Sequence, residues 1–377
     1  MKPRLLLLCF SPLRRDPRVL RQLKVLRDDY DVSTCGFGPA PDDVVEHYEI
    51  PDSSKGWWPV ELAMAGAYVL TRQFARFYRN EPRVKAALEL VPQGHFDVII
   101  ANDLNTVPLA SMLRPTKGFH ADLHEWEPRV PGSGPVWFFI NHPYIQWQLR
   151  QLKRASSATT VAQGIADAYS DTYGVRAGVV TNAADYADLS PTETTTPLRI
   201  IHSGGASKAR RIDVMIDAMR GVDNATLELM LVSYGDNIIE TLKEYAAGMP
   251  NVTFREPVGY ADLVTTLNDY DLGMHLLAPT SFNNKMALPN KLFEYVQARL
   301  GIIIGPSPEM ARIVNEHDLG VVSDDFSAES LREVIQSLTA EHVAKYKQNS
   351  HNAAEALSSE RAVQPWLAAV RAIAPTA

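Results

Sequence analysis

Three side chains of the segment Leu-Pro-Asn-Lys-Leu-Phe-Glu-Tyr, residues 288–295, have types and a spacing that suit phosphate chemistry. Glu294 follows Asn290 by four residues and Lys291 by three, which places all three near one another on a helix. Pro289 suits the first turn of that helix, and a helix start offers free N–H groups to a phosphate. Lys291 adds a cation, and Glu294 can accept hydrogen bonds from a ribose diol. An ordinary amphipathic helix with a surface Lys–Glu pair fits the segment equally well.

A second candidate for phosphate binding is the run Leu-Arg-Ile-Ile-His-Ser-Gly-Gly-Ala-Ser-Lys-Ala-Arg-Arg, which starts at residue 198. A strand is expected to end at Gly204 and Gly205, where the absence of side chains allows a ligand to approach the backbone. Arg210 or Lys208 could then pair with a diphosphate. A tight turn alone explains the glycines, but the combination with Lys291 favours a nucleotide site.

Composition and charge narrow the class of protein. The chain has 377 residues, more than one hydrophobic core usually serves, and its net charge of −7 argues against nucleic-acid binding. Cys9 and Cys35 lie in apparent strands and offer neither a disulfide framework nor a metal-ligand spacing. The apolar run Leu5–Phe10 is too short for a secretory signal, and no segment is apolar enough to span a bilayer. We expect a cytoplasmic protein, with any membrane association at the inner face.

The order of strand-like and helical segments predicts an α/β protein with two Rossmann-like halves. We expect strands at Leu5–Phe10, Phe96–Ala101, Phe119–Leu123, Ala158–Val161, Gly178–Thr181, Leu198–His202, Leu227–Val232, Val252–Phe254, Leu272–Leu277, Gly301–Gly305 and Gly320–Val322. The polar, Pro-flanked stretch 185–197 is typical of a linker. The domains are therefore expected at 1–187 and 188–360, with a C-terminal helix in 361–377 that packs back toward the first domain. Ligands are expected in a cleft between the two halves.

Several segments in this order resemble glycosyltransferases of the GT-B fold, in the retaining family 4 group. They cover nearly the whole chain: Arg15-Asp-Pro-Arg-Val-Leu-Arg, Asn102-Asp-Leu-Asn-Thr-Val-Pro-Leu-Ala, Ala121-Asp-Leu-His-Glu-Trp, Val180-Thr-Asn-Ala-Ala-Asp, Ser203-Gly-Gly through Arg210, Pro289 through Tyr295, and Pro308-Glu-Met-Ala-Arg-Ile-Val. The resemblance implies two Rossmann-like domains whose parallel sheets face each other across a cleft.

The resemblance also implies roles for single residues. Arg210 and Lys291 match basic residues that neutralise the departing diphosphate, and Glu294 matches the second glutamate of the Glu-x7-Glu motif, which binds the ribose. His124 matches a histidine that reaches toward the donor sugar. The remaining donor-binding positions are Gly204, Gly205, Gly235, Asn290 and Leu292, and the acceptor-side positions are Asp16, Arg18, Asp103 and Glu125.

One departure from the family pattern concerns sugar recognition. Met286 stands where the first glutamate of the paired motif is expected, eight positions before Glu294. Because that glutamate contacts the donor sugar in the family, recognition here must differ or use Asn283, Asn284 or Lys285.

The reaction implied is transfer of a sugar from a nucleoside diphosphate to an acceptor hydroxyl with retention of anomeric configuration, by a hexosyltransferase-type enzyme (EC 2.4). Fixed cations stabilise the leaving diphosphate, so no cofactor and no metal are expected, and Asp42-Asp43 and Asp324-Asp325 are interpreted as loop residues. The nucleotide of the donor is expected to be UDP, GDP or dTDP. The acceptor is a carbohydrate, a lipid-linked molecule or a small molecule, as in surface polysaccharide, glycolipid or natural-product glycosylation.

Two features raise the hypothesis of contact with an anionic membrane. Arg14, Arg18 and Arg21 recur at helical spacing, although a solvated helix face explains them as well. The segment from Gly56-Trp-Trp-Pro to Tyr78 is apolar and aromatic with interspersed arginines, although such a stripe more often packs inside a domain.

Two other classes of function remain open. A nucleotide-sugar epimerase shares this architecture and would need acid and base carboxylates, of which the sequence shows no convincing pair. A non-catalytic sugar-nucleotide-binding partner subunit is the second alternative, suggested by Met286. A Rossmann dehydrogenase is disfavoured because no Gly-x-Gly-x-x-Gly follows the first strand.

Overall fold

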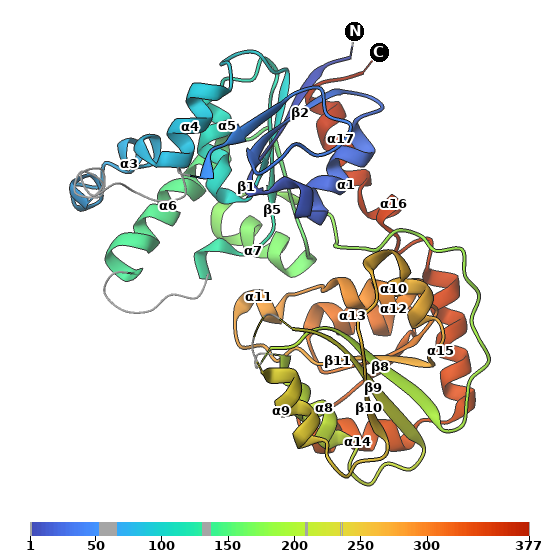
Figure 1. Ribbon diagram of the computed structural model, residues 1–377. Coiled ribbons are helices and arrows are strands. Elements are labelled where there is room, and N and C mark those ends of the chain that lie inside the picture. Colours follow the sequence, from blue (N-terminus) through green and yellow to red (C-terminus); the bar gives the residue numbers. More distant parts are fainter. Residues whose placement is uncertain are drawn as a thin grey trace. The chain divides into compact units, whose positions relative to one another are not determined.

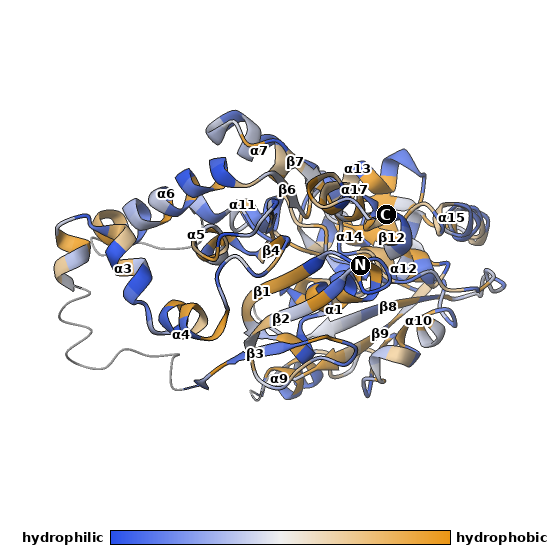
Figure 2. Cartoon of the chain, turned by 90° about the horizontal axis from the view of Figure 1, so that it is seen from above, coloured by the Kyte–Doolittle hydropathy of each residue, from blue (hydrophilic) through white to orange (hydrophobic). Residues whose placement is uncertain are grey.

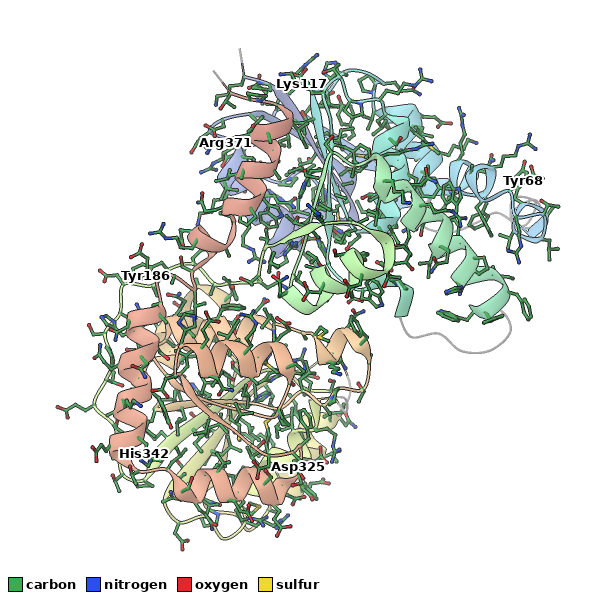
Figure 3. All side chains as sticks on the ribbon, turned by 180° about the vertical axis from the view of Figure 1, so that it is seen from behind. Tyr68, Lys117, Tyr186, Asp325, His342 and Arg371 are labelled. Carbon is green, nitrogen blue, oxygen red and sulfur yellow. The ribbon has the colours of Figure 1, made fainter. Side chains whose placement is uncertain are left out.

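The computed structural model describes residues 2–52, 66–129, 137–207, 210–233, 235 and 237–376. The chain divides into two compact units, Met1–Val180 with Val363–Ala377, and Thr181–Ala362 (Figure 1). The first unit thus ends seven residues before the boundary expected from the sequence. Residues 181–187 belong to the second unit because Arg299 donates to the Ala187 carbonyl at 2.5 Å and its guanidinium lies over the Tyr186 ring (Tyr186 is labelled in Figure 3).

Unit 1 is built on a parallel sheet with the strand order β3-β2-β1-β4-β5-β6-β7. Its strands are β1 (Arg4–Pro12), β2 (Asp31–Phe37), β3 (His47–Ile50), β4 (Val98–Asn102), β5 (Gly118–Leu123), β6 (Ser157–Thr160) and β7 (Ala177–Val179). Its α-helices include α1 (Pro17–Leu26), α3 (Phe74–Asn80), α4 (Pro82–Leu90), α5 (Val107–Met112), α6 (His142–Gln151), α7 (Gln163–Tyr173) and α17 (Gln364–Ile373).

Helices cover both faces of this sheet, which explains the unbroken apolar runs of its central strands. Leu5 to Leu8 of β1 are all fully buried, and β1 is coloured as hydrophobic along most of its length in Figure 2. Val19, Leu23, Leu26 and Tyr30 pack on one face together with residues of α17, as the helical spacing of the α1 residues predicts. The last helix of the chain is therefore part of the core of unit 1.

Unit 2 has a six-stranded parallel sheet with the order β10-β9-β8-β11-β12-β13. Its strands are β8 (Leu198–Gly205), β9 (Ala225–Val232), β10 (Val252–Arg255), β11 (Leu272–His275), β12 (Gly301–Ile304) and β13 (Gly320–Val322). Its helices include α8 (Ile212–Ala218), α9 (Ile238–Tyr245), α10 (Tyr260–Leu267), α11 (Phe282–Lys285), α12 (Asn290–Gln297), α13 (Pro308–Glu316), α14 (Ala328–Ser337), α15 (Ala340–Ala353) and α16 (Ser359–Ala362). Figure 1 shows α8, α9 and α14 on one side of the sheet and α10, α12 and α13 on the other.

All eleven strands expected from the sequence are present, with bounds that differ by a few residues. The expected bounds did not cover β2 or β3, although Cys35, which lies in β2, was placed in an apparent strand. Strand β2, Asp-Val-Ser-Thr-Cys-Gly-Phe, alternates polar and small residues, and β3 has four residues at the sheet edge. Both lack the continuous apolar run that marks the buried strands. Among the described residues, no helix combines the length and hydrophobicity that crossing a membrane requires.

Candidate active site

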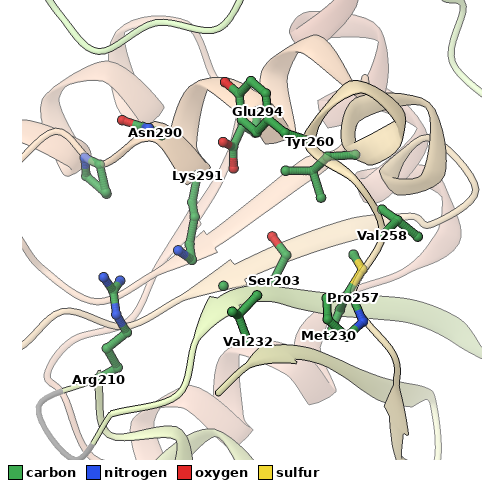
Figure 4. Close-up of a pocket in the computed structure, with 13 residues that line it drawn as sticks. Ser203, Arg210, Met230, Val232, Pro257, Val258, Tyr260, Asn290, Lys291 and Glu294 are labelled. Atoms are coloured by element: carbon green, nitrogen blue, oxygen red, sulfur yellow. The ribbon is translucent and has the colours of Figure 1, made fainter. Parts of the chain in front are cut away.

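A cavity of about 500 Å³ lies in unit 2, at the carboxyl ends of β8 and β9 and the start of α12 (Figure 4). It is lined by Ser203, Gly204, Arg210, Met230, Val232, Pro257, Val258, Tyr260, Leu263, Pro289, Asn290, Lys291 and Glu294. The two sequence segments that suit phosphate binding therefore meet at one cavity. This position, beyond the carboxyl ends of parallel strands, is where open α/β sheets bind ligands.

The side chain of Lys291 lies directly on the backbone of Gly204. Gly204 has a φ of +135°, and a Cβ at this position would collide with Cε and Nζ of Lys291. Glycine is required here both for the backbone conformation and for the close approach of the lysine. Pro289 precedes α12 with an extended backbone instead of occupying its first turn, a correction to the sequence prediction. Asn290 and Lys291 are the first two residues of the helix.

Two cations face this cavity without a carboxylate partner. Figure 4 shows the Lys291 amine and the Arg210 guanidinium directed into the same space. Neither side chain forms a hydrogen bond or ion pair with another described residue. Burial, followed by the positive charge of Arg210, lowers the pKa of Lys291 to about 8, and Glu294 opposes this effect. The site is therefore an electropositive pocket in which an anion would relieve the repulsion.

Glu294 lies on the same helix, one turn after Lys291. Its side chain is 6% exposed, and burial raises the pKa of its carboxyl group, with Lys291 opposing the shift. No described residue donates a hydrogen bond to this carboxylate. An apolar wall completes the cavity through Pro257, Val258 and Tyr260. The combination of a hydrogen-bond acceptor and an apolar wall suits a diol and a flat ring.

A second polar cluster lies in unit 1, where β1, β4 and β5 end. His124 follows β5, and its Nδ1 lies 3.0 Å from Oδ1 of Asp103, while its Nε2 lies 3.5 Å from Oδ2 of Asp122. Asp103 has a φ of +67°, an unfavourable conformation for a residue other than glycine. Strain of this kind is often found at functional sites, where the surroundings hold it in place.

Arg18 and Asp122 form the centre of this cluster. The Arg18 guanidinium donates to both carboxylate oxygens of Asp122, at 2.7 and 2.6 Å, and the two residues are 5% and 0% exposed. The prediction that Arg18 belongs to a basic surface is therefore wrong, because its charge is buried and paired. Asp16 caps α1 by accepting from the N–H groups of Arg18 and Val19.

The charges of the cluster shift several pKa values. Burial favours a neutral Asp122, but the positive charge of Arg18 and the proximity of His124 hold the pKa of Asp122 well below its ordinary value. Burial lowers and the two aspartates raise the pKa of His124, and the net shift is upward. Burial, with the charge of Asp103 and Glu125, raises the pKa of Glu127 to about 7. Unit 1 thus presents an imidazole whose protonated form is favoured by the two aspartates and a carboxyl group that is partly protonated at neutral pH.

Comparisons with known proteins bear on the fold. No protein-family model and no curated protein sequence matches the chain. Among solved structures, Anabaena HepE in complex with UDP-glucose has a TM-score of 0.68 at 14% identity, over 98% of this chain and 100% of HepE. Sucrose-phosphate synthase from Thermosynechococcus elongatus has a TM-score of 0.70 at 12% identity, over 100% of both chains. The α,α-trehalose 6-phosphate synthase from Burkholderia multivorans has a TM-score of 0.65 at 11% identity, over 99% of both chains. The chain has the GT-B fold.

Three of the residues that the sequence assigned to a GT-B donor site do not line this cavity. Gly205 is buried in β8, Leu292 is 1% exposed in the core, and Gly235 lies in an exposed bend with a φ of +92°. None of these lines the cavity, whereas Gly204, Arg210, Asn290, Lys291 and Glu294 do. Lys208 lies outside the described residues. Asn283, Asn284 and Lys285 form α11 and, with Met286, are not among the lining residues.

The residues predicted for the acceptor side belong to the unit 1 cluster, with one exception. Asp16, Arg18 and Asp103 gather around Asp122 and His124, while the Glu125 side chain is exposed. Asp122 received no role in the sequence analysis, although it stands in the segment Ala121-Asp-Leu-His-Glu-Trp. The feature that could have identified Asp122 is its position as a charged residue at the end of a buried strand.

The sequence analysis also missed a pair of histidines in unit 2. His202 and His275 are stacked with centroids 5.8 Å apart, and they are 0% and 1% exposed. Burial, then the charge of Lys291, lowers the pKa of His202 to about 3. Both rings are therefore neutral. Within the described residues, no group of three or more His, Cys, Asp or Glu side chains could hold a metal ion.

Proposed function

We propose that the protein is a glycosyltransferase that moves a sugar from a nucleoside-diphosphate sugar to an acceptor hydroxyl. The observation that carries this proposal is the pair of unpartnered cations, Lys291 and Arg210, that face the cavity above Gly204. A diphosphate supplies the negative charge that this pocket lacks. The GT-B fold and the sugar-nucleotide complexes of structurally similar proteins support the same conclusion.

The chemistry follows from where charge develops. Cleavage of the anomeric C–O bond leaves negative charge on the departing diphosphate and positive character on the sugar ring. Lys291, Arg210 and the free N–H groups at the start of α12 stabilise the departing charge. These groups supply the stabilisation that a divalent cation supplies in other transferases, so the proposed reaction is metal-independent.

Glu294 and the apolar wall accommodate the rest of the nucleotide. The Glu294 carboxylate accepts hydrogen bonds from the ribose diol, and the base lies against Pro257, Val258 and Tyr260. We assign the donor as a UDP-sugar, in preference to GDP or dTDP, because HepE is similar in structure along its whole length and binds UDP-glucose.

The finer assignment is a retaining, family 4-like hexosyltransferase. His124 contacts the donor sugar, and the leaving phosphate accepts the proton of the acceptor hydroxyl, so that no separate general base is assigned. The acceptor is a carbohydrate, a lipid-linked molecule or a small molecule. Product stereochemistry, read from the anomeric coupling constant by NMR, tests retention, and an inverted product contradicts it.

The cytoplasmic assignment and contact with an anionic membrane remain part of this proposal. Residues 53–65, which include Gly56-Trp-Trp-Pro, lie outside the described residues. On α3, Phe74 and Tyr78 are buried, whereas Arg76 and Arg79 are exposed. The apolar side of α3 thus packs inside unit 1, and its basic side is available to anionic lipid. Liposome flotation tests this, and equal recovery with neutral and anionic vesicles would reject it.

The donor site is tested by binding and turnover in matched variants. A thermal-shift series with UDP, GDP, dTDP and ADP is expected to show the largest stabilisation with UDP. Lys291→Ala and Arg210→Ala are expected to lose this response and to lose turnover of UDP-sugars. Lys243→Ala removes an exposed lysine from α9 of the same unit and is the control.

The outcomes separate the parts of the proposal. Wild-type turnover in both Lys291→Ala and Arg210→Ala would reject the diphosphate site. Glu294→Gln keeps the cations but weakens the diol contact, so we expect about tenfold weaker UDP binding. Strong binding of a nucleotide with no turnover against a broad set of acceptors would instead identify a non-catalytic partner subunit.

An epimerase is the second candidate, favoured by one observation. With its pKa raised to about 7, Glu127 can both accept and donate a proton at neutral pH, and His124 lies in the same cluster. This is the type of group that epimerisation requires. Incubation with a UDP-sugar alone distinguishes the two reactions: an epimerase converts it to an isomeric sugar nucleotide, whereas a transferase needs an acceptor.

A further inference from the structure

The C-terminal helix α17 contributes a buried polar side chain to the unit 1 cluster. Trp366 is 0% exposed, and its Nε1–H donates to Oγ1 of Thr159 at 3.1 Å. Its ring also lies under the Arg18 guanidinium, 4.7 Å from the ring centroid. The chain reaches this position only after it has passed through unit 2. A tryptophan from the last helix therefore contacts two residues that surround Asp122.

The hydroxyl group of Thr159 connects Trp366 to Asp122, and its one proton and two lone pairs all take part in hydrogen bonds. Oγ1 lies 2.7 Å from Oδ1 of Asp122 and 2.8 Å from Nε2 of His120. An ionised carboxylate only accepts, so the single hydroxyl proton of Thr159 is directed to Asp122. The two lone pairs then accept from Trp366 and from His120, which fixes the His120 tautomer with its proton on Nε2. Burial lowers the pKa of His120 to about 4, which agrees with a neutral ring.

The hydrogen bonds to Asp122 hold its carboxylate in a single orientation. Oδ1 accepts from Thr159 and Arg18, and Oδ2 accepts from Arg18 and Gln22. The same Oδ2 faces Nε2 of His124 at 3.5 Å. Because Thr159 and Arg18 approach from fixed strands and helices, the plane of the carboxylate is set before any ligand binds. The imidazole of His124 takes its orientation from Asp122 on one side and Asp103 on the other.

We propose that Trp366 is a positioning residue for His124, acting through Thr159 and Asp122. This inference rests on the proposed function, which assigns His124 to the donor sugar. In this arrangement the last helix of the chain determines how a side chain at the end of β5 is presented. Loss of the Trp366 indole N–H leaves the Thr159 hydroxyl held only by His120 and Asp122, so that Thr159 can shift and its contact with Asp122 weakens. The Nε2–Oδ2 contact then lengthens, and His124 loses its fixed orientation.

The test uses the full-length protein and the conservative variants Trp366→Phe, Thr159→Val and Thr159→Ser. Trp366→Phe keeps an aromatic ring beneath Arg18 but removes the N–H donor, and Thr159→Ser retains the hydroxyl. Trp147→Phe is the matched control, since Trp147 packs against Tyr78 and Tyr144 in unit 1 away from the cluster. Histidine NMR titration, assigned with His124→Gln, reads the proton affinity of His124 without donor or acceptor.

We expect Thr159→Val and Trp366→Phe to lower the proton affinity of His124 about tenfold, with Thr159→Ser and Trp147→Phe unchanged. Arg18 keeps Asp122 ionised in every variant. A fall in the proton affinity of His124 therefore reports a longer distance between His124 and Asp122. A folded Trp366→Phe protein with the wild-type His124 titration would overturn the proposal. If Trp366→Phe does not fold, a Thr159→Val titration equal to that of Thr159→Ser would overturn it instead.

Steady-state kinetics provides a second readout, and it distinguishes failure of the proposed function from failure of the positioning role of Trp366. Both variants are expected to lower kcat with little change in UDP affinity, because the donor diphosphate is assigned to residues of unit 2. Absence of any transferase activity in the wild-type protein would reject the proposed function, yet the NMR comparison would still decide whether Trp366 positions His124.

Discussion

The two units carry polar sites at the same end of similar sheets, but the charges are arranged in opposite ways. In unit 1, Arg18 and Asp122 form a buried two-pronged ion pair, and His124 lies between two carboxylates. In unit 2, Lys291 and Arg210 face one cavity with no carboxylate partner for either. The central charges of the unit 1 site are paired internally, whereas the unit 2 site leaves positive charge for an external anion.

A fully buried lysine elsewhere in unit 2 shows that this difference is specific to the cavity. Lys347 is 1% exposed, and its amine donates to Asp271, Thr192 and the carbonyl of Tyr270, at 3.1, 2.9 and 3.1 Å. Burial of a charged group is costly unless hydrogen bonds and a counter-charge compensate it. Lys347 has that compensation and stabilises the fold, whereas Lys291 lacks it and is suited to bind a ligand.

The largest expected effect is the loss of the paired charge in unit 1. Arg18→Met leaves Asp122 as a buried, uncompensated carboxylate, which is expected to reduce the free energy of unfolding by about 3–5 kcal/mol. Urea unfolding followed by tryptophan fluorescence measures this change. The double variant Arg18→Met/Asp122→Leu should recover much of the loss, because it removes both charges. If Arg18→Met is as stable as the wild type, the Arg18–Asp122 pair contributes no more to stability than an ion pair at the surface.

The half-buried Lys291 and the fully buried Lys347 sharpen the comparison further. Lys291→Met is expected to reduce kcat by roughly 10²–10³-fold with no loss of folding stability, because it removes a stabiliser of the leaving group and relieves repulsion with Arg210. Lys347→Met is expected to do the reverse, lowering the melting temperature while the folded fraction keeps its turnover. Steady-state kinetics and thermal unfolding of both proteins decide this. A large stability loss in Lys291→Met would place that lysine among the structural residues.

The sequence predicted the fold better than it predicted the partners within the sites. Continuous apolar runs such as Leu5–Leu8 identify buried strands without knowledge of the rest of the chain, whereas β3 gives no such signal. Lys291 and Glu294 are neighbours through helix periodicity, so their proximity is local information. The pairing of Arg18 with Asp122 spans 104 residues, and only the folded sheet brings the two together. Arg18 was therefore assigned to the acceptor side and considered for a basic helix face, and its pairing with Asp122 was not predicted.

Binding of UDP is expected to depend on pH through Lys291. In the unliganded protein, burial and Arg210 lower the pKa of Lys291 to about 8, and a bound diphosphate raises it by supplying the missing counter-charge. Binding then takes up a proton, and the affinity falls by up to tenfold for each pH step above about 8 until the pKa of the complex is reached. Calorimetry in buffers with different ionisation enthalpies measures the uptake. Lys291→Arg should abolish it, and a pH-independent affinity in the wild type would contradict the assignment.

The smallest expected effect concerns Glu127, whose charge is not compensated in the otherwise paired cluster of unit 1. Its pKa of about 7 in the folded protein lies above the ordinary value of 4.5, so the folded state favours the protonated form. Folding stability is therefore expected to fall as the pH rises from about 4.5 to 7, and to stay lower above that range. Glu127→Gln removes this cost and should be about 1 kcal/mol more stable than the wild type at pH 8, after allowance for its partial exposure, but nearly equal at pH 5. Urea unfolding at both pH values provides the measurement, with Glu89→Gln, which alters an exposed glutamate of α4, as the control. A stability difference that is the same at pH 5 and pH 8 would mean that Glu127 carries no buried charge, and the contrast between a fully paired unit 1 and an unpaired unit 2 would then be complete.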